Sequence, residues 1–110
     1  MIYLASPYSH ISTAVMQQRY EDAARYTSFH LRIGICLFSP IVYGHQIAID
    51  YNLPGDAGFW RELNESLLIR CDCMWVLKLE GWEHSAGVLS EIALAEEMGI
   101  EIKYREPLGK

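Results

Sequence analysis

The chain has 110 residues, of which 51% are hydrophobic, and it carries a formal net charge of −5 at pH 7. This length and composition predict a single folded domain, 1–110, and argue against a second domain or a disordered chain. The acidic balance argues against a nucleic-acid polymer as partner, and no apolar run reaches the roughly 18 residues of a membrane span. A single nucleotide is still compatible with this charge, because its phosphate needs only one local site.

Two features predict a cytoplasmic protein. The chain opens directly on the apolar stretch Met1-Ile2-Tyr3-Leu4, without the basic segment of a signal peptide. Its three cysteines are odd in number and have no disulfide spacing, which fits a reducing compartment.

Apolar periodicity and turn residues predict alternating strands and helices. A strand at 2–5 leads, across a loop that contains Pro7, to a long helix that Ser12 or Thr13 caps and Gly34 ends. Then follow a short strand (35–38), a weakly patterned short helix (43–51), a helix (57–71), a strand (73–79), a helix (85–98) and a strand (100–104). Residues 105–110 are predicted to form a tail.

This alternation predicts parallel β-α-β units. The expected fold class is α/β, a Rossmann-like (flavodoxin-like) three-layer sandwich whose central parallel sheet has four to five strands in the order 2-1-3-4. In such sheets ligands bind where the carboxyl ends of the strands meet the amino termini of helices.

Three polar residues, Arg19, Asn64 and Glu91, fall on the apolar faces of predicted helices. An inward arginine can snorkel or pair with a structural carboxylate, and an inward asparagine can be a satisfied core amide. A carboxylate on a buried face, however, must be paired, protonated or used. All three residues are expected near the carboxyl edge of the sheet, where they would face one crevice. Tyr3, in the central strand, is either a hydroxyl donor to Glu91 or an ordinary core aromatic.

The histidines and cysteines do not predict a metal site or a resident cofactor. The four histidines lie in separate elements: His10, His30, His45 and His84. Cys71-x-Cys73 lacks the spacing of a zinc site. Cys36 and Cys73 lie in predicted strands and are expected in the core, which argues against a cysteine nucleophile. His45 is instead expected to line the crevice.

Three motifs along the chain carry a resemblance. They are Ile2-Tyr3-Leu4-Ala5-Ser6-Pro7, Cys71-Asp72 ahead of a strand, and Gly81-Trp82-Glu83-x-Ser85-x-Gly87-x-x-x-Glu91 followed by Ala95 and Gly99. Together they resemble the nucleoside 2-deoxyribosyltransferase superfamily, over residues 1–104. Within it, the chain is most similar to the 2'-deoxynucleoside 5'-phosphate N-hydrolase-like branch and to small uncharacterised bacterial and phage proteins.

The resemblance implies cleavage of the N-glycosidic bond of a deoxynucleoside or its 5'-monophosphate, with Glu91 as nucleophile and Tyr3 holding it. Ser85 matches a serine that contacts the 5'-phosphate in the hydrolases, where the transferases carry a sugar-binding aspartate. Hydrolysis is therefore favoured over base transfer. The resemblance also implies assembly as a homodimer or a higher homo-oligomer.

Two positions depart from the family pattern. Asn64 stands where the family has an aspartate that contacts the base, and an amide cannot protonate a leaving base. Three explanations stay open: another acid, Glu65 or Glu62, protonates the base, the substrate differs, or the activity is low. Tyr8 stands where the hydrolases carry an arginine in the first loop, and Arg19 is the candidate for the missing cation.

The chemistry implied is stabilisation of a cation-like sugar by a close carboxylate, which can also trap it covalently. Glu91 must be ionised to attack, and Tyr3 and the helix amino terminus are expected to favour that form. Candidates for stacking on the base are Trp82, Tyr8 and Phe38. The predicted substrate-binding residues are Ser6, Tyr8, Arg19, His45, Asn64, Trp82, Ser85 and Gly87.

Two other classes of function compete with this hypothesis. A nucleotide-binding or sensing module on the same fold, without turnover, is favoured by Asn64 and by the short chain. A structural interaction domain would leave the inward Arg19, Asn64 and Glu91 unexplained.

Overall fold

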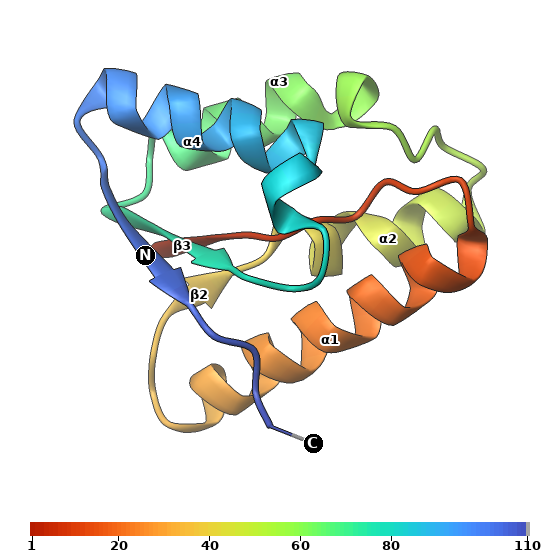
Figure 1. The fold of residues 1–110 in the computed structure, drawn as a ribbon, viewed down its shortest axis with the longest axis horizontal. Coiled ribbons are helices and arrows are strands. Elements are labelled where there is room, and N and C mark those ends of the chain that lie inside the picture. The colour runs from red at the N-terminus through yellow and green to blue at the C-terminus, as the bar shows by residue number, and fades with distance from the viewer. Residues whose placement is uncertain (110) are drawn as a thin grey trace.

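A parallel sheet of four strands forms the centre of the computed structural model, which describes residues 1–109 and so excludes Lys110, the last residue of the predicted tail (Figure 1). The strands are β1 (Ile2–Ala5), β2 (Leu37–Phe38), β3 (Cys73–Leu77) and β4 (Glu101–Arg105). They lie in the order β2-β1-β3-β4, and every neighbouring pair is parallel. The predicted strand order is confirmed.

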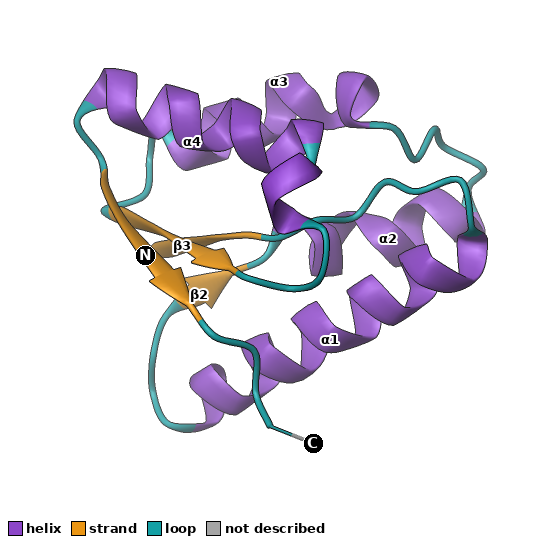
Figure 2. Cartoon of the chain, viewed as in Figure 1, coloured by secondary structure: helices purple, strands orange, loops and turns teal. Residues whose placement is uncertain are grey.

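Helices cover both faces of this sheet (Figure 2). Helix α1 (Thr13–Arg32) lies on one face, and the pair α3 (Ala57–Leu68) and α4 (Ala86–Met98) packs on the other. Helix α2 (Pro40–Asp50) packs against α1 beside the carboxyl ends of the strands (Figure 1). A short 3-10 turn, η1 (Trp82–His84), precedes α4. The arrangement is the predicted α/β, Rossmann-like three-layer fold, which is thereby confirmed.

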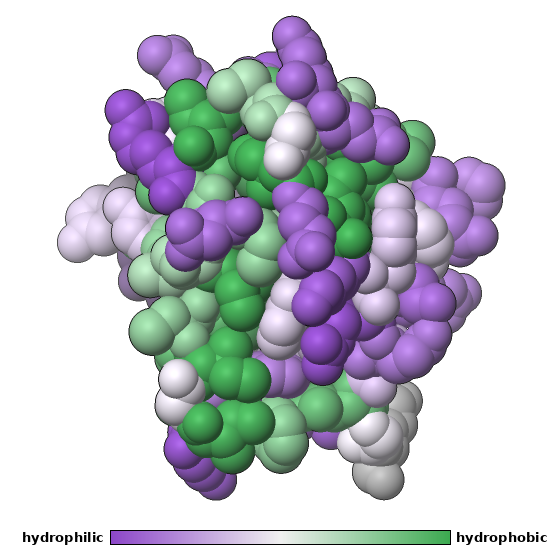
Figure 3. All heavy atoms as spheres, turned by 90° about the vertical axis from the view of Figure 1, so that its left-hand side faces the viewer, coloured by the Kyte–Doolittle hydropathy of each residue, from purple (hydrophilic) through white to green (hydrophobic). Residues whose placement is uncertain are grey.

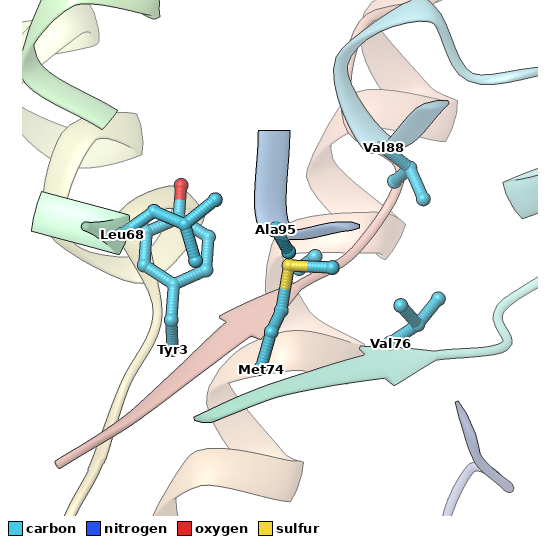
Figure 4. Packing of buried hydrophobic residues seen from close by; sticks show 7 residues of the cluster. Tyr3, Leu68, Met74, Val76, Val88 and Ala95 are labelled. Atoms are coloured by element: carbon cyan, nitrogen blue, oxygen red, sulfur yellow. The ribbon is translucent and has the colours of Figure 1, made fainter. Parts of the chain in front are cut away.

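The alternation of side chains along β1 divides the core into two parts. Tyr3 and Ala5 point towards the α3–α4 layer, where they join a fully buried cluster with Leu68 of α3 and Val88 of α4 (Figure 4). Leu4 points the other way, into a second cluster on the α1 face. Because β1 and β3 are buried on both faces, their sequences are continuous apolar runs.

Several predicted boundaries shift. Helix α2 starts at Pro40, earlier than predicted, because the Ser39 hydroxyl accepts a hydrogen bond from the Val42 amide at 3.2 Å and proline suits the first helical position. Helix α3 ends at Leu68 and β3 at Leu77, each earlier than predicted. β4 runs to Arg105, so the tail begins one residue later.

The second strand is only two residues long, and this shortening exposes a cysteine that was expected in the core. β2 pairs with β1 through Leu37 and Phe38. Cys36 precedes the strand and is exposed, while Cys73 in β3 is partly buried. The predicted burial of Cys36 is therefore wrong.

The amino and carboxyl edges of the sheet differ in character. Figure 3 views the face on which the strands begin, where apolar and polar side chains are interspersed. Exposed apolar residues at the helix ends that meet this edge include Ile33, Ile69 and Met98.

Within the part of the chain that the structure describes, no helix combines the length and apolarity that crossing a membrane requires.

Leu68 and Leu63 provide a matched test of the core, because both lie on α3. Leu68 is fully buried in the α3–α4 core, whereas Leu63 is 40% exposed. We expect Leu68→Ala to lower the free energy of unfolding by about 2–5 kcal/mol through lost burial and a residual cavity. Leu63→Ala should cost well under half of that. Urea denaturation of both variants measures the difference, and equal losses would contradict the placement of this core.

Candidate functional site

A cavity of about 360 Å3 opens at the carboxyl edge of the sheet. Its walls are the loop after β1, the first turns of α2, one face of α3 and the amino-terminal half of α4. The volume lies in the range of small-molecule sites. Seven predicted site residues line it: Glu91, Ser6, Tyr8, His45, Asn64, Ser85 and Gly87.

Glu91 lies on the inner face of α4, between the fully buried Val88 and Ala95. Its carboxylate accepts a hydrogen bond from the Tyr3 hydroxyl. Tyr3 is fully buried, and its ring rises from β1 towards the α3–α4 layer (Figure 4). Strand and helix periodicity therefore bring these two residues together from opposite ends of the chain, as predicted.

The electrostatics of this pair differ from the expectation. The pKa of Glu91 is raised to about 7: burial is the largest cause, the hydrogen bond from Tyr3 acts to lower the pKa, and the nearby Glu65 acts to raise it. Burial and the charge of Glu91 also raise the pKa of Tyr3 well above its ordinary value. Glu91 lies beyond the first turn of α4, where the helix dipole has faded. The expected preference for the ionised form is thus outweighed by desolvation.

Only one of the two candidate acids on α3 lies at the cavity. Glu65 lines the cavity and is partly buried, beside Asn64. Glu62 is exposed and does not line it. Glu65 is therefore the carboxyl group that can meet a ligand together with Glu91.

The amino terminus of α4 forms another part of the wall. Ser85 caps the helix, and its hydroxyl oxygen accepts a hydrogen bond from the Val88 amide at 3.3 Å. Ser85, Ala86 and Gly87 line the cavity, and the amides at the start of a helix have no partner within the helix. Ser6 also lines it; this residue is 5% exposed, and its hydroxyl has no partner among the described residues. These groups suit a sugar hydroxyl or an anion.

Tyr8 and His45 meet at another wall. The Tyr8 hydroxyl lies 2.6 Å from His45 Nδ1, and the other ring nitrogen, Nε2, lies 3.0 Å from the side-chain oxygen of Gln17. His45 is 4% exposed and stacks on the Tyr20 ring at 4.1 Å between centroids. Desolvation lowers the pKa of His45. The ring is held in a fixed orientation.

Arg19 is directed inward, as predicted, but it does not line the cavity. Its guanidinium donates hydrogen bonds to the backbone carbonyls of Ser9 at 3.1 Å and Glu80 at 3.2 Å. It thereby ties the loop after β1 to the loop after β3. Gly81 has φ +88°, and a Cβ there would lie 2.7 Å from the Arg19 guanidinium. The predicted contact of Arg19 with substrate is not supported by this position, because the guanidinium is occupied by the two loops.

The positions of Trp82 and Phe38 also differ from the expectation of base stacking. The Trp82 ring packs against the α3–α4 core cluster and against the Tyr104 ring at 5.5 Å. Phe38 lies beside Tyr43, and neither Trp82 nor Phe38 lines the cavity. Of the three stacking candidates, only Tyr8 borders the space.

Sequence reasoning missed one aromatic residue of this wall. Trp60 was not among the predicted site residues, but it lines the cavity. The ring passes over Gly44 of α2, where an added Cβ would come within 3.3 Å of it, and its Nε1–H donates to the Pro54 carbonyl at 2.7 Å. No local sequence pattern predicts this contact, because it depends on how α2 and α3 are placed relative to each other.

Among the residues that the structure describes, no three histidine, cysteine or acidic side chains gather closely enough to hold a metal ion.

Comparison with known proteins gives one family match. The sequence pattern of a family described as a domain of unknown function (DUF1937) matches residues 1–106. No curated protein matches the chain.

The raised pKa of Glu91 predicts that its ionisation destabilises the fold. The folded state holds this proton up to about pH 7, whereas the unfolded chain releases it near 4.5, so stability falls between these values and is then constant. Glu91→Gln keeps an acceptor for Tyr3 without the charge. At pH 8 we expect it to raise the free energy of unfolding by roughly 1–3 kcal/mol, with little change at pH 4.5.

The matched control is Glu96→Gln, which alters an exposed carboxylate on the same helix. It should change stability little at either pH. Denaturant titrations at pH 4.5 and 8 check both variants, and an equal effect of Glu91→Gln at the two values would count against a desolvated carboxylate.

Proposed function

The chain belongs to the DUF1937 family, a domain of unknown function, and we propose that it hydrolyses the N-glycosidic bond of a deoxynucleoside or deoxynucleoside 5'-monophosphate. The observation that carries the proposal is the Glu91 carboxylate, held by the Tyr3 hydroxyl at the wall of a cavity of nucleoside size. A desolvated carboxylate fixed beside a cavity that also carries hydroxyl and amide groups is the group that a cation-like sugar requires.

In the first step the ionised Glu91 attacks the anomeric carbon while the bond from carbon to the base nitrogen breaks, and its electron pair leaves with the base. Tyr3 remains protonated, because burial and Glu91 raise its pKa, and it orients the attacking oxygen. The product of this step is a glycosyl ester on Glu91.

Glu65 is proposed as the acid that protonates the leaving base, since it lines the same cavity and Asn64 has no acidic proton to give. Its carboxylate then takes a proton from water, which attacks the glycosyl ester and releases the sugar. Glu91 and Glu65 thus return to their starting states. A second base in place of water would give transfer, which is the other outcome of the same intermediate.

The amino terminus of α4 is proposed to hold the sugar end of the substrate. Ser85, Gly87 and the unpartnered Ser6 hydroxyl provide donors near Glu91. They are neutral groups, suited to the sugar hydroxyls or to a 5'-phosphate. The base then extends towards the aromatic wall of Tyr8 and Trp60.

A binding or sensing module without turnover is the second candidate. The observation in its favour is the combination of Asn64 at the cavity with a Glu91 whose pKa of about 7 leaves part of it protonated at neutral pH. Both features weaken glycosidic cleavage while leaving a formed cavity. A ligand-induced rise in melting temperature without any released base would select this function.

Assembly as a homodimer or higher oligomer stays a prediction. Exposed apolar side chains on α3 and α4, among them Phe59, Leu63 and Leu89, provide surface that a second copy would bury.

Incubation of the purified protein with deoxynucleosides and their 5'-monophosphates should release free base, detected by chromatography. We expect Glu91→Gln to lower kcat/KM by about 10³-fold or more, since it removes the nucleophile and keeps the Tyr3 contact. With a deoxyriboside whose leaving group departs without protonation, the rate of the unaltered protein should rise about tenfold per pH unit up to about pH 7 and then level off, because Glu91 must be ionised; with ordinary bases the rate should fall again at higher pH, because the acid must be protonated. Failure to release base from any substrate, with the variant indistinguishable, would remove the catalytic proposal.

Glu65→Gln and Glu62→Gln test the identity of the acid on one helix. Glu65→Gln should lower the release of an ordinary base by about 10²–10⁴-fold, the usual contribution of a general acid. It should slow much less the cleavage of a deoxyriboside whose leaving group is an acidic nitrophenol, because that group departs without protonation. Glu62→Gln should behave like the unaltered protein with both substrates. Equal loss on both leaving groups would show that Glu65 acts in another way.

A further inference from the structure

The hydrogen bonds around His45 determine where the Tyr8 proton lies. Gln17 donates from its side-chain amide to the Glu21 carboxylate at 3.0 Å, which turns its carbonyl oxygen towards His45. His45 Nε2 must therefore carry a proton and donate it to Gln17. In the neutral ring Nδ1 then has a lone pair, and the only group that faces it at 2.6 Å is the Tyr8 hydroxyl.

The neutral ring is the form that its surroundings favour. His45 is buried against the Tyr20 ring, which offers no charge, and desolvation lowers its pKa. The acidic Glu21 acts in the opposite direction but more weakly. Tyr8 thus donates its single proton to His45, and its oxygen has only lone pairs left to present to the cavity.

The face of α3 that borders the cavity carries Glu65, which the proposed mechanism uses as a proton donor, and Asn64, whose amide can donate or accept. The Tyr8 oxygen differs from these groups because it can only accept. Arg61 also borders the cavity and supplies donors, but its side chain is exposed, whereas Tyr8 is partly buried. The partly buried Tyr8 oxygen would lose its bond to water without replacement if it met another acceptor.

We propose that the Tyr8–His45 pair selects an N-glycoside whose base places an exocyclic amino group at the Tyr8 oxygen, so that amino-substituted bases of the cytosine and adenine type are preferred over their oxo counterparts, uracil and hypoxanthine, whose exocyclic carbonyl would meet that oxygen with a second acceptor. The inference rests on the proposed function for placing the base at this wall. It goes beyond that function because it assigns the class of base from the direction of one hydrogen bond. His45 acts as a positioning residue, through Tyr8.

Two substrate pairs test the inference: deoxycytidine against deoxyuridine, and deoxyadenosine against deoxyinosine, each as the deoxynucleoside and as its 5'-monophosphate. The members of each pair differ in the exocyclic group and in the adjacent ring nitrogen, which carries a proton only in the oxo member. Binding is measured calorimetrically on Glu91→Gln, so that turnover plays no part. We expect the amino member of each pair to bind about tenfold more tightly, the effect of avoiding one unsatisfied buried acceptor. Equal binding, or tighter binding of the oxo member, would overturn the inference.

Variants added to the Glu91→Gln background identify the residues responsible. Tyr8→Phe removes the acceptor and should bring the amino-to-oxo ratio to within about twofold of unity. His45→Leu frees the Tyr8 proton and should shift the ratio towards the oxo bases. The matched control is Tyr43→Phe, which removes a hydroxyl from an exposed tyrosine of α2 that does not line the cavity. It should leave the ratio unchanged, and an unchanged ratio in Tyr8→Phe would contradict the proposed role.

The experiment separates this inference from the proposed function. Binding and cleavage of deoxynucleosides without a preference for amino bases would leave the hydrolase standing and refute the selection by Tyr8. If amino bases bind more tightly but the unaltered protein releases no base, the selection by Tyr8 stands and the hydrolase proposal is refuted. If neither the deoxynucleosides nor their 5'-monophosphates bind, both fail.

Discussion

The hydrogen bond from Tyr3 to Glu91 is the interaction on which the site depends. It joins the central strand to α4 across the buried α3–α4 core, where Val88 and Ala95 exclude water on either side of the carboxylate. Burying this carboxylate costs free energy, and the raised pKa expresses that cost. A purely structural position would be filled more favourably by an apolar residue. The retained carboxylate therefore marks a place where the fold gives up stability for a chemical group.

The loops around the cavity are fixed by contacts that lie behind it. Arg19 bridges the carbonyls of Ser9 and Glu80, and Gly81 permits this approach because it has no Cβ. His45 is held in a similar way, by Tyr20 and Gln17 from α1. One helix, α1, therefore sets both loops and the orientation of the histidine while contributing no residue to the cavity wall itself. Polar residues on its inner side serve to position the residues that do line the wall.

Much of the fold followed from periodicity alone. Apolar runs and caps predicted the strand order and four helices, and the same periodicity directed Glu91, Asn64 and Arg19 inward. Periodicity does not predict which group an inward side chain contacts. Arg19 reaches backbone carbonyls, whose positions depend on the path of two loops. Trp82 turns into the core because Gly81, in a left-handed conformation, starts a 3-10 turn instead of an open loop. The apolar residues on several faces of α2 hid its period, although Ser39 and Pro40 marked its start.

The positions of Glu91 and Glu65 limit how the proposed nucleoside substrate can lie in the cavity. Glu91 and Glu65 come from different helices and lie close enough for Glu65 to raise the pKa of Glu91. Burial favours the protonated form of Glu91, whereas the proposed reaction needs Glu91 ionised as the nucleophile and a proton on Glu65 as the acid. Ionisation of Glu91 is therefore the step that a bound substrate has to promote, and a developing positive charge on the sugar beside Glu91 would do so. These roles suit a single glycosidic bond placed between α4 and α3, with the sugar at the helix amino terminus and the base against Tyr8 and Trp60.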